Sequence, residues 1–439
     1  MVAPARRLTL IPLVAATYFM VCGGPYGLEE LVAKSGYGRT LVLLLLTPLI
    51  WSLPTALMVG ELSGAIPEEG GYYAWVRRAL GPFWGFQEAW LSLVASVFDM
   101  AIYPTLFACY LGRLFPSVAT GWPATLLGVG MIAICAAWNV RGSRAVGLAS
   151  LVMTFLLLAP FVLLVLISAS HHAVTPPPVA SSGWLAAILV AMWNFMGWDN
   201  ASTVAGEVEN PQRTYPLAML ITVCLVAATY ILPVLACRRA GLDAHDWETG
   251  AWVDAATAIG GRALGIAVVL GGIVCAVGMF NALVMSYSRV PHALAVDGFL
   301  PKFVTRLHPK SGAPWVAILL CAVAYASSLG LGFDRLVELD VLLYGLSLLL
   351  EFVALVALRL REPALPRRFR VPGGLVGAIA VGVAPMTLLV IALIQGRTER
   401  AGAIPTLLLG GILISLGPPL YFLGSRFKRP VIAARGRLH

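Results

Sequence analysis

Acidic side chains lie within apolar stretches of this sequence, close to two places where those stretches are interrupted. The first interruption, GGPYG, begins at Gly23 and is followed by Glu29, and the second, at 194–200, contains Asp199. Asp99 lies near the middle of a long apolar stretch between them. An ionisable side chain at membrane depth costs at least about 2.5–3.5 kcal/mol and by default marks a pathway, a partner or a proton relay. Because no Lys or Arg occupies the central part of any such stretch, these acids are suited to bind a cation or a proton.

The composition indicates that these residues lie in a membrane. Of the 439 residues, 59% are hydrophobic and only 12% are charged, and the mean hydropathy is +0.86, whereas a soluble protein has about 25% charged residues. A spanning helix needs about 20 apolar residues. Twelve stretches qualify: 9–33, 40–65, 83–115, 121–139, 145–169, 184–206, 215–237, 264–288, 314–330, 336–358, 374–395 and 402–424. The sequence therefore predicts an all-α integral membrane protein with twelve transmembrane helices.

The distribution of Lys and Arg predicts the orientation in the membrane. With the N-terminus inside, the cytoplasmic side collects 21 of the 30 Lys and Arg residues and the other side nine, and positively charged loops remain in the cytoplasm. We therefore expect a multi-pass protein of the cell membrane with both termini cytoplasmic. The net charge of +9 reflects this topology and contact with the anionic lipid bilayer, so it indicates no nucleic-acid partner.

The two interruptions occur in corresponding halves of the chain. Non-helical backbone is tolerated at membrane depth only where it meets protein or a water-filled cavity. Five helices beginning with a broken one, five more beginning with a broken one, and two peripheral helices are the layout of an inverted-repeat transporter core. We expect residues 1–210 to hold the first repeat (helices 1–5) and the start of the second (helix 6), 211–361 to hold helices 7–10, and 362–439 to hold helices 11–12 and a basic cytoplasmic tail, all in one membrane domain.

The third predicted helix carries polar residues along one face. Glu88, Ser92, Asp99 and Tyr103 are spaced by four, seven and four residues, and such spacings align side chains on a helix. Asp99 is either an anionic partner for a cationic substrate or a proton, or a protonated or hydrogen-bonded structural acid. Tyr103 either hydrogen-bonds Asp99, stacks on a cation or packs in the core.

The residues around the two interruptions are candidates for substrate contact. Glu29 lies where a half-helix begins and its dipole is positive, so it either binds a ligand or only stabilises the helix start. Asp199 could bind substrate, hold the unwound backbone or act in a gate. Aromatic side chains there suit an organic cation, although Trp near helix ends also anchors proteins at the membrane interface. The predicted substrate-binding set is Gly23, Gly24, Tyr26, Glu29, Asp99, Tyr103, Trp193, Asn194, Trp198 and Asp199.

Three acids are candidates for proton coupling, namely Asp99, Glu207 and Glu351. Glu207 lies near a cytoplasmic helix end, as do Glu61 and Glu209. These three are expected mainly as structural or inner-gate charges, paired with Arg77, Arg78 or Arg213. Glu351 is either a proton site or a partner of Arg359 or of a loop arginine.

The remaining reactive residues predict no cofactor and no enzyme. The seven cysteines lie in or at the ends of apolar spans without CxxC spacing, so neither a disulfide framework nor a metal site is indicated. The six His residues fall outside the spans, and no nucleophile has a base at motif spacing.

Four long motifs resemble those of the amino acid, polyamine and organocation permeases. They are GELSGAIPEEGGYYAWV after helix 2, GEVENPQRTYP after helix 6, SRVPHALAVDGFLP after helix 8 and LREPALPRRFRVPGG after helix 10. Within that group the chain is most similar to the branch that includes the proton-coupled polyamine transporters of plants and trypanosomatids. The similarity lies in the first break from Gly23 to Glu29, in WGFQE at 84–88, in Asp99 with Tyr103, and in the sixth helix from Trp198 to Glu207.

The resemblance implies a LeuT-like fold with broken helices 1 and 6, alternating access, and import of a cation together with protons. One departure bears on the substrate. Other permeases commonly have Gly-Ser-Gly-Ile at the first break, which receives an amino acid's carboxylate, whereas here Pro25 removes one backbone donor.

Three functional hypotheses follow. The first is a secondary transporter that imports polyamines or related organic cations, coupled to protons. The second is a proton-coupled transporter of neutral or cationic amino acids. The third is a channel or a transport-dead receptor, and the sequence disfavours it because there is neither a repeated filter segment nor an appended soluble domain.

Overall fold

The computed structural model describes residues 8–118, 120–170, 173–177, 184–245, 247–329, 333–395, 400–401 and 404–426. These residues are almost entirely helical, and the strands among them are the short antiparallel pair β1 (Arg400–Ala401) and β2 (Ile404–Pro405). Nine helical stretches of the described chain are long and apolar enough to cross a membrane. This confirms the predicted class of all-helical membrane protein.

The first predicted helix is broken where glycine and proline interrupt it. Helix α1 (Leu10–Val21) ends before the non-helical residues 22–28, and α2 (Glu29–Thr47) then begins. Gly24 and Gly27 have φ of 81° and 94° in this segment, values that favour glycine. A second kink at Gly36 (φ 67°) divides α2, and its later part continues through the π-helical turn η1 (Pro48–Ser52) into α3 (Leu53–Ala65).

The sixth predicted helix is broken as well. Helix α8 (Trp184–Asn194) ends before the non-helical residues 195–198, and the 3₁₀ helix η3 (Asp199–Glu207) follows. Gly197 has φ of 93° there. A Cβ atom at Gly197 would lie 2.3 Å from the carbonyl oxygen of Met20 in α1, so the two breaks lie against each other.

The other elements form the rest of the bundle. Helix α10 (Ala251–Tyr287) bends at Gly261 (φ 79°). The remaining elements are α4 (Tyr72–Leu80), α5 (Pro82–Gly112), η2 (Pro116–Val118), α6 (Gly121–Asn139), α7 (Ser143–Ser170), α9 (Pro211–Arg239), α10 (Ala251–Tyr287), α11 (Arg289–Val296), η4 (Lys302–Thr305), α12 (Trp315–Ser327), α13 (Phe333–Arg361), α14 (Gly374–Gln395), α15 (Thr406–Ser415) and α16 (Gly417–Ser425).

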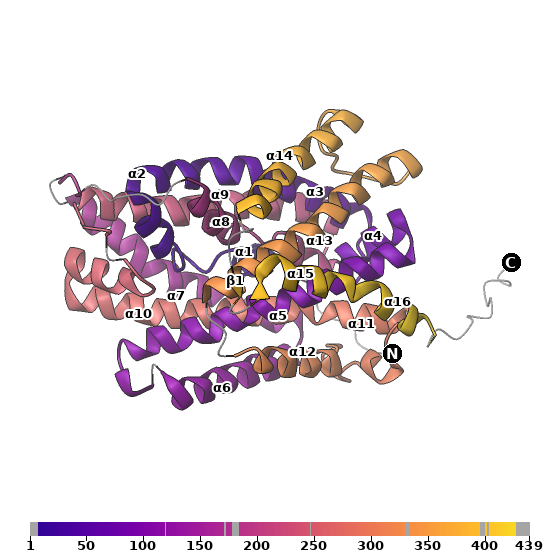
Figure 1. The fold of residues 1–439 in the computed structure, drawn as a ribbon, viewed down its shortest axis with the longest axis horizontal. Coiled ribbons are helices and arrows are strands. Elements are labelled where there is room, and N and C mark those ends of the chain that lie inside the picture. Colours follow the sequence, from indigo (N-terminus) through magenta and orange to yellow (C-terminus); the bar gives the residue numbers. More distant parts are fainter. Residues whose placement is uncertain are drawn as a thin grey trace, which may run out of the picture.

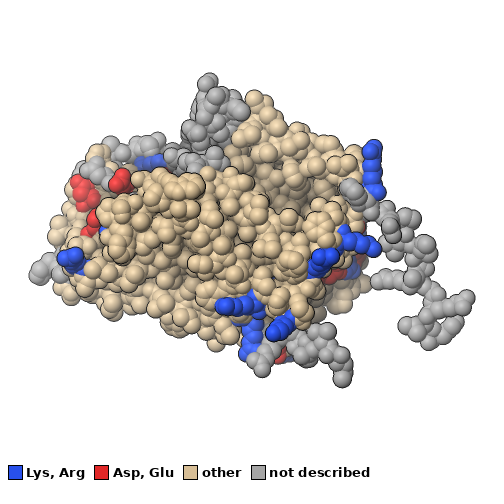
Figure 2. Space-filling view, turned by 90° about the horizontal axis from the view of Figure 1, so that it is seen from below, with Lys and Arg blue, Asp and Glu red and all other residues tan. Residues whose placement is uncertain are grey.

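The long helices run roughly parallel to one axis of the molecule (Figure 1). Helix α5 packs against α10 and α13, α1 packs against α7, α9 and α10, and α4 crosses one end of the bundle against α5 and α13. In the face drawn in Figure 2, charged side chains lie toward the two ends, with a broad uncharged surface between them. Large apolar side chains such as Phe155 and Val323 are exposed, as expected for side chains that face lipid.

Replacing Gly197 with Ala tests the contact between the breaks. We expect the Gly197→Ala protein to lose at least about 2 kcal/mol of stability, because Ala must adopt a positive φ and its Cβ would clash with the Met20 carbonyl. Gly130→Ala in α6 is the matched control, since its Cβ meets nothing within 4 Å. Thermal unfolding in detergent measures both, and equal midpoints for the two variants would contradict the expectation.

Candidate functional site

A cavity of about 30 Å³ lies where the two breaks face α5, α10 and α13. Space of that size holds about two water molecules, so a larger ligand requires its walls to move. Six of the ten predicted substrate-binding residues line the cavity, namely Gly23, Tyr26, Asp99, Tyr103, Trp193 and Asn194. The segments that supply them are far apart in the sequence, and the fold brings them together.

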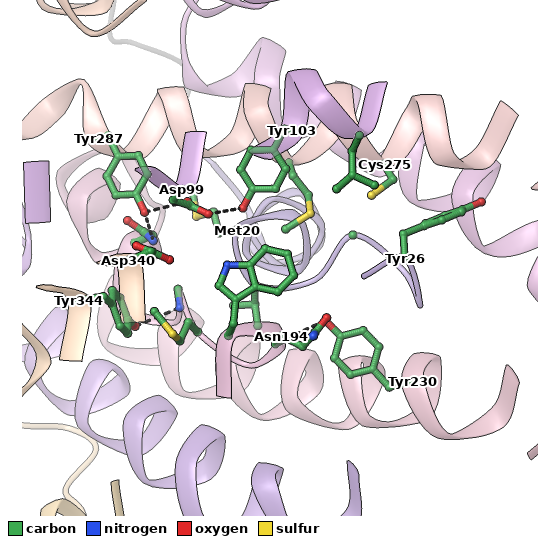
Figure 3. A pocket seen from close by; sticks show the side chains of 18 residues that line it. Met20, Tyr26, Asp99, Tyr103, Asn194, Tyr230, Cys275, Tyr287, Asp340 and Tyr344 are labelled. Carbon is green, nitrogen blue, oxygen red and sulfur yellow. Dashed lines mark hydrogen bonds between the residues drawn. The ribbon is translucent and has the colours of Figure 1, made fainter. Parts of the chain in front are cut away.

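Asp99 in α5 is held by two tyrosine hydroxyls. Tyr103 donates a hydrogen bond of 2.7 Å to Oδ1, and Tyr287 in α10 donates one of 3.3 Å to Oδ2 (Figure 3). Asp99 is 6% exposed, so these phenols replace much of its water. Tyr103 takes the hydrogen-bonding role among its predicted alternatives. A ligand that donates hydrogen bonds to Asp99 would therefore compete with, or add to, these two neutral hydroxyl donors.

A second acid in the cavity, Asp340 in α13, was not among the predicted site residues. Asp340 lines the cavity and interacts electrostatically with Asp99. Figure 3 shows both carboxylates on the same side of the cavity. One sequence signal could have found it. Asp340 is followed four residues later by Tyr344, as Asp99 is by Tyr103.

Asp199 holds the second break and does not line the cavity. The Tyr344 hydroxyl donates a hydrogen bond to Asp199 Oδ1 and accepts one of 3.0 Å from the Gly197 amide. Of the three predicted roles, the geometry supports holding the unwound backbone. Trp198 is also outside the cavity. Its indole is fully buried, and the indole N–H donates a hydrogen bond of 2.9 Å to the Phe195 carbonyl.

Glu29 lies outside the cavity too, although the sequence placed it in the substrate site. Its Oε1 accepts from the Tyr110 hydroxyl (2.7 Å) and the Gly250 amide (3.2 Å), and its Oε2 accepts from the Gly27 amide (2.6 Å). The carboxylate thus ties the first break to α5 and to the start of α10. Gly24, also predicted in the site, lies beside Leu157 instead.

The aromatic residues of the cavity have different roles. The Tyr26 hydroxyl points away from the acids and donates to the Val268 carbonyl over 2.6 Å (Figure 3). Tyr230 in α9 donates to the Asn194 carbonyl over 2.7 Å. Tyr230 and Tyr287 were missed from sequence because nothing in their local spacing points to the breaks.

The sequence of the chain matches the model of one family over residues 14–413, described as amino acid permease. The chain belongs to this family. It is therefore a membrane transporter of small molecules and not an enzyme, as predicted.

Several curated relatives support the same conclusion. A probable polyamine transporter of Arabidopsis thaliana is 35% identical over 91% of this permease and 81% of its own length. A polyamine transporter of Oryza sativa subsp. japonica is 35% identical over 90% of this chain and 75% of its own. The serine/threonine exchanger SteT of Bacillus subtilis is 27% identical over 84% of this chain and 85% of its own length.

Ion pairs join the loops of the permease at its α4 end. Buried Glu61 binds Arg359 at 2.5 Å and Arg367 at 3.2 Å, and Glu207 binds fully buried Arg289 at 3.0 Å. The predicted partners of Glu61 and Glu207 were wrong, since the arginines come from α13, from the loop after it and from the start of α11. Glu207, one of the predicted proton-coupling residues, is thus paired with Arg289 and does not line the cavity.

The arginines predicted as partners bind other acids. Arg78 binds Glu362 at 2.6 Å, and this hydrogen bond holds the pKa of the exposed Glu362 below its usual range. Arg77 binds Asp297 and Glu68. Glu351 is not paired with Arg359 and lies buried, with no hydrogen-bond partner for either oxygen among the described residues. Among those residues no group of His, Cys, Asp or Glu could hold a metal ion.

Replacing Glu61 with Gln tests the α4-end network. We expect Glu61→Gln to cost about 3–5 kcal/mol, because it leaves Arg359 without its buried partner. Glu30→Gln, which breaks a partly exposed pair with Lys34, should cost less than about 1 kcal/mol. Unfolding midpoints in detergent measure the stability of both variants. A Glu61→Gln protein as stable as the Glu30→Gln protein would contradict the expectation.

Proposed function

We propose that this permease imports polyamines or related organic cations, coupled to protons, by alternating access. One observation carries the proposal, namely the pair of carboxylates Asp99 and Asp340 in one cavity beside two helix breaks. The cavity lining contains no Lys or Arg. Two buried acids without a cation favour a ligand that brings positive charge.

The aromatic walls support the same ligand class. Tyr103 and Tyr287 lie at the carboxylate of Asp99, and Trp193 lies across the cavity. Aromatic faces attract ammonium groups and also accommodate methylene chains, the two parts of a polyamine. The relatives named as polyamine transporters, at 35% identity over most of both chains, support this choice.

The two breaks support a LeuT-like core of two inverted five-helix repeats with two peripheral helices. In this arrangement the twelve predicted spans include α1 and α12, which are apolar but shorter than the other spans. The repeats divide the chain as the sequence predicts, with residues 1–210 holding helices 1–6, 211–361 holding helices 7–10 and 362–439 holding the rest. The bias of Lys and Arg supports a cell-membrane protein with cytoplasmic termini, so the α4 end faces the cytoplasm.

Transport of an amino acid is the second candidate, and the likeness to a serine/threonine exchanger favours it. An amino acid's carboxylate would need free backbone donors at the first break. Pro25 has none, and the Gly27 amide already donates to Glu29. The local geometry thus favours the cationic substrate.

Competition for uptake separates these two candidates. We expect putrescine or spermidine to block uptake of a labelled polyamine into proteoliposomes, whereas serine, threonine and lysine leave it unchanged. An inward proton gradient should increase the uptake. Uptake blocked only by compounds with an α-carboxylate would instead establish the amino acid transporter.

Neutralising Asp99 tests the amine site. We expect Asp99→Asn to lower polyamine uptake by at least about 30-fold, since losing the charge partner of a buried ammonium costs 2 kcal/mol or more. Asp254→Asn is the control, because that exposed acid pairs with Arg113 far from the cavity. Both proteins should insert and fold as the unmodified one does, and unchanged uptake by Asp99→Asn would remove Asp99 from the site.

A further inference from the structure

A second layer of acids lies between the cavity and the α4 end of the bundle. It consists of Glu88 in α5, Asp199 in η3 and Glu351 in α13, each at most 1% exposed. Glu88 precedes Asp99 by eleven residues, and Glu351 follows Asp340 by eleven. Eleven residues span about 16 Å of helix and nearly three whole turns, so each pair shares a helix face. The two helices thus carry the acids in two matched layers.

The three carboxylates of this inner layer have few hydrogen-bond donors among the described residues. Ser347 donates to Glu88 Oε1, and Tyr344 donates to Asp199 Oδ1. Glu88 Oε2 and both oxygens of Glu351 have no partner among the described residues. Glu88 and Asp199 both act electrostatically on Glu351. Glu351 is therefore a buried acid that lies near two other acids and has no donor among the described residues.

The surroundings supply no cation. Tyr72 of α4 faces all three acids, and its hydroxyl accepts a hydrogen bond of 2.7 Å from Ser92 of α5. Asp340 of α13 adds a further negative group near Asp199. No ion pair in the described part of the chain includes the inner-layer acids, and the arginine of α13, Arg359, binds Glu61.

Of the possible cations, a proton is the one that best stabilises these three buried carboxylates. Three ionised carboxylates without water or a countercharge would repel one another and lose their solvation. A protonated carboxyl carries one O–H donor, so a proton on Glu351 provides a hydrogen bond to a neighbouring carboxylate and removes one charge. The described acids are not arranged to hold a metal ion.

We propose that Glu88, Asp199 and Glu351 form the proton-binding site of this permease, separate from the amine site at Asp99 and Asp340. This inference rests on the proposed cation transport. The two sites are joined through Tyr344, which binds both Asp199 and the Gly197 amide in the cavity wall. A change in protonation of the inner layer therefore acts on the backbone break beside the substrate.

Glu351→Gln tests the proposal in the full-length protein, because Gln keeps the size of a protonated Glu but cannot exchange a proton. In proteoliposomes we expect polyamine exchange at the unmodified level, while accumulation driven by a pH gradient and proton entry measured with an internal pH dye are both lost. The infrared band of buried protonated carboxyl groups, recorded without substrate, should also weaken. Glu30→Gln is the control and should change none of these.

Each outcome decides a different question. If the unmodified protein neither binds nor transports any amine, the proposed function fails, and the infrared comparison still decides whether the inner layer holds a proton. Gradient-driven accumulation and proton entry retained in Glu351→Gln overturn the inference while the transport function stands. Accumulation that requires Na⁺ in the unmodified protein, and not in Glu351→Gln, makes the layer a sodium site and also overturns it. Glu88→Gln replaces Glu351→Gln in all measurements if the latter does not fold.

Discussion

Unwound backbone inside an apolar bundle must find hydrogen-bond partners from elsewhere in the chain, and this constraint organises the structure. At the first break, the Glu29 carboxylate accepts from the Gly27 amide and reaches α5 and α10. At the second, Tyr344 accepts from the Gly197 amide and donates to Asp199. Two acids that resemble ligand-binding groups in the sequence are thus part of the scaffold. Without them the unpaired backbone groups would cost several kcal/mol each in hydrocarbon.

The acids to which we assign the proposed functions lie in two layers along α5 and α13, and Asp199, which also holds the second break, belongs to the inner layer. The outer layer, Asp99 and Asp340, faces a cavity and has tyrosines as donors. The inner layer is sealed and partly without donors. A carboxylate that lines a cavity suits an ammonium group, whereas a fully buried one with few donors suits a proton, because a proton removes the charge without needing space. In the proposed transport, the same residue type therefore binds two ligands, an ammonium group at the cavity and a proton in the inner layer.

Ion pairs hold the α4 end of the bundle together, as a closed side in the proposed alternating access would require. Glu61 with Arg359 and Glu207 with Arg289 bind segments that are far apart in the sequence, and the Leu8 amide donates to the Glu207 carbonyl. The cavity of about 30 Å³ is too small for a polyamine, so the proposed transport requires its walls to move. Buried ion pairs are strong when formed and costly to break. They are suited to close one side of the protein until substrate and proton are bound.

The sequence by itself determined the membrane class, the positions of the helices and both breaks, because apolar length, glycine and proline act locally. It also identified Asp99 with Tyr103, since a helix aligns residues four apart. Only the tertiary structure decided which acids share a space. Glu29 is bound by the Gly27 and Gly250 amides and Asp199 by the Tyr344 hydroxyl, partners that local patterns do not locate. Asp340 enters the cavity through the packing of α13 on α5. The arginines that pair with Glu61 and Glu207 come from the distant helices α13 and α11 and from the loop after α13. Such pairings depend on how helices pack side by side, a property that no stretch of sequence contains alone.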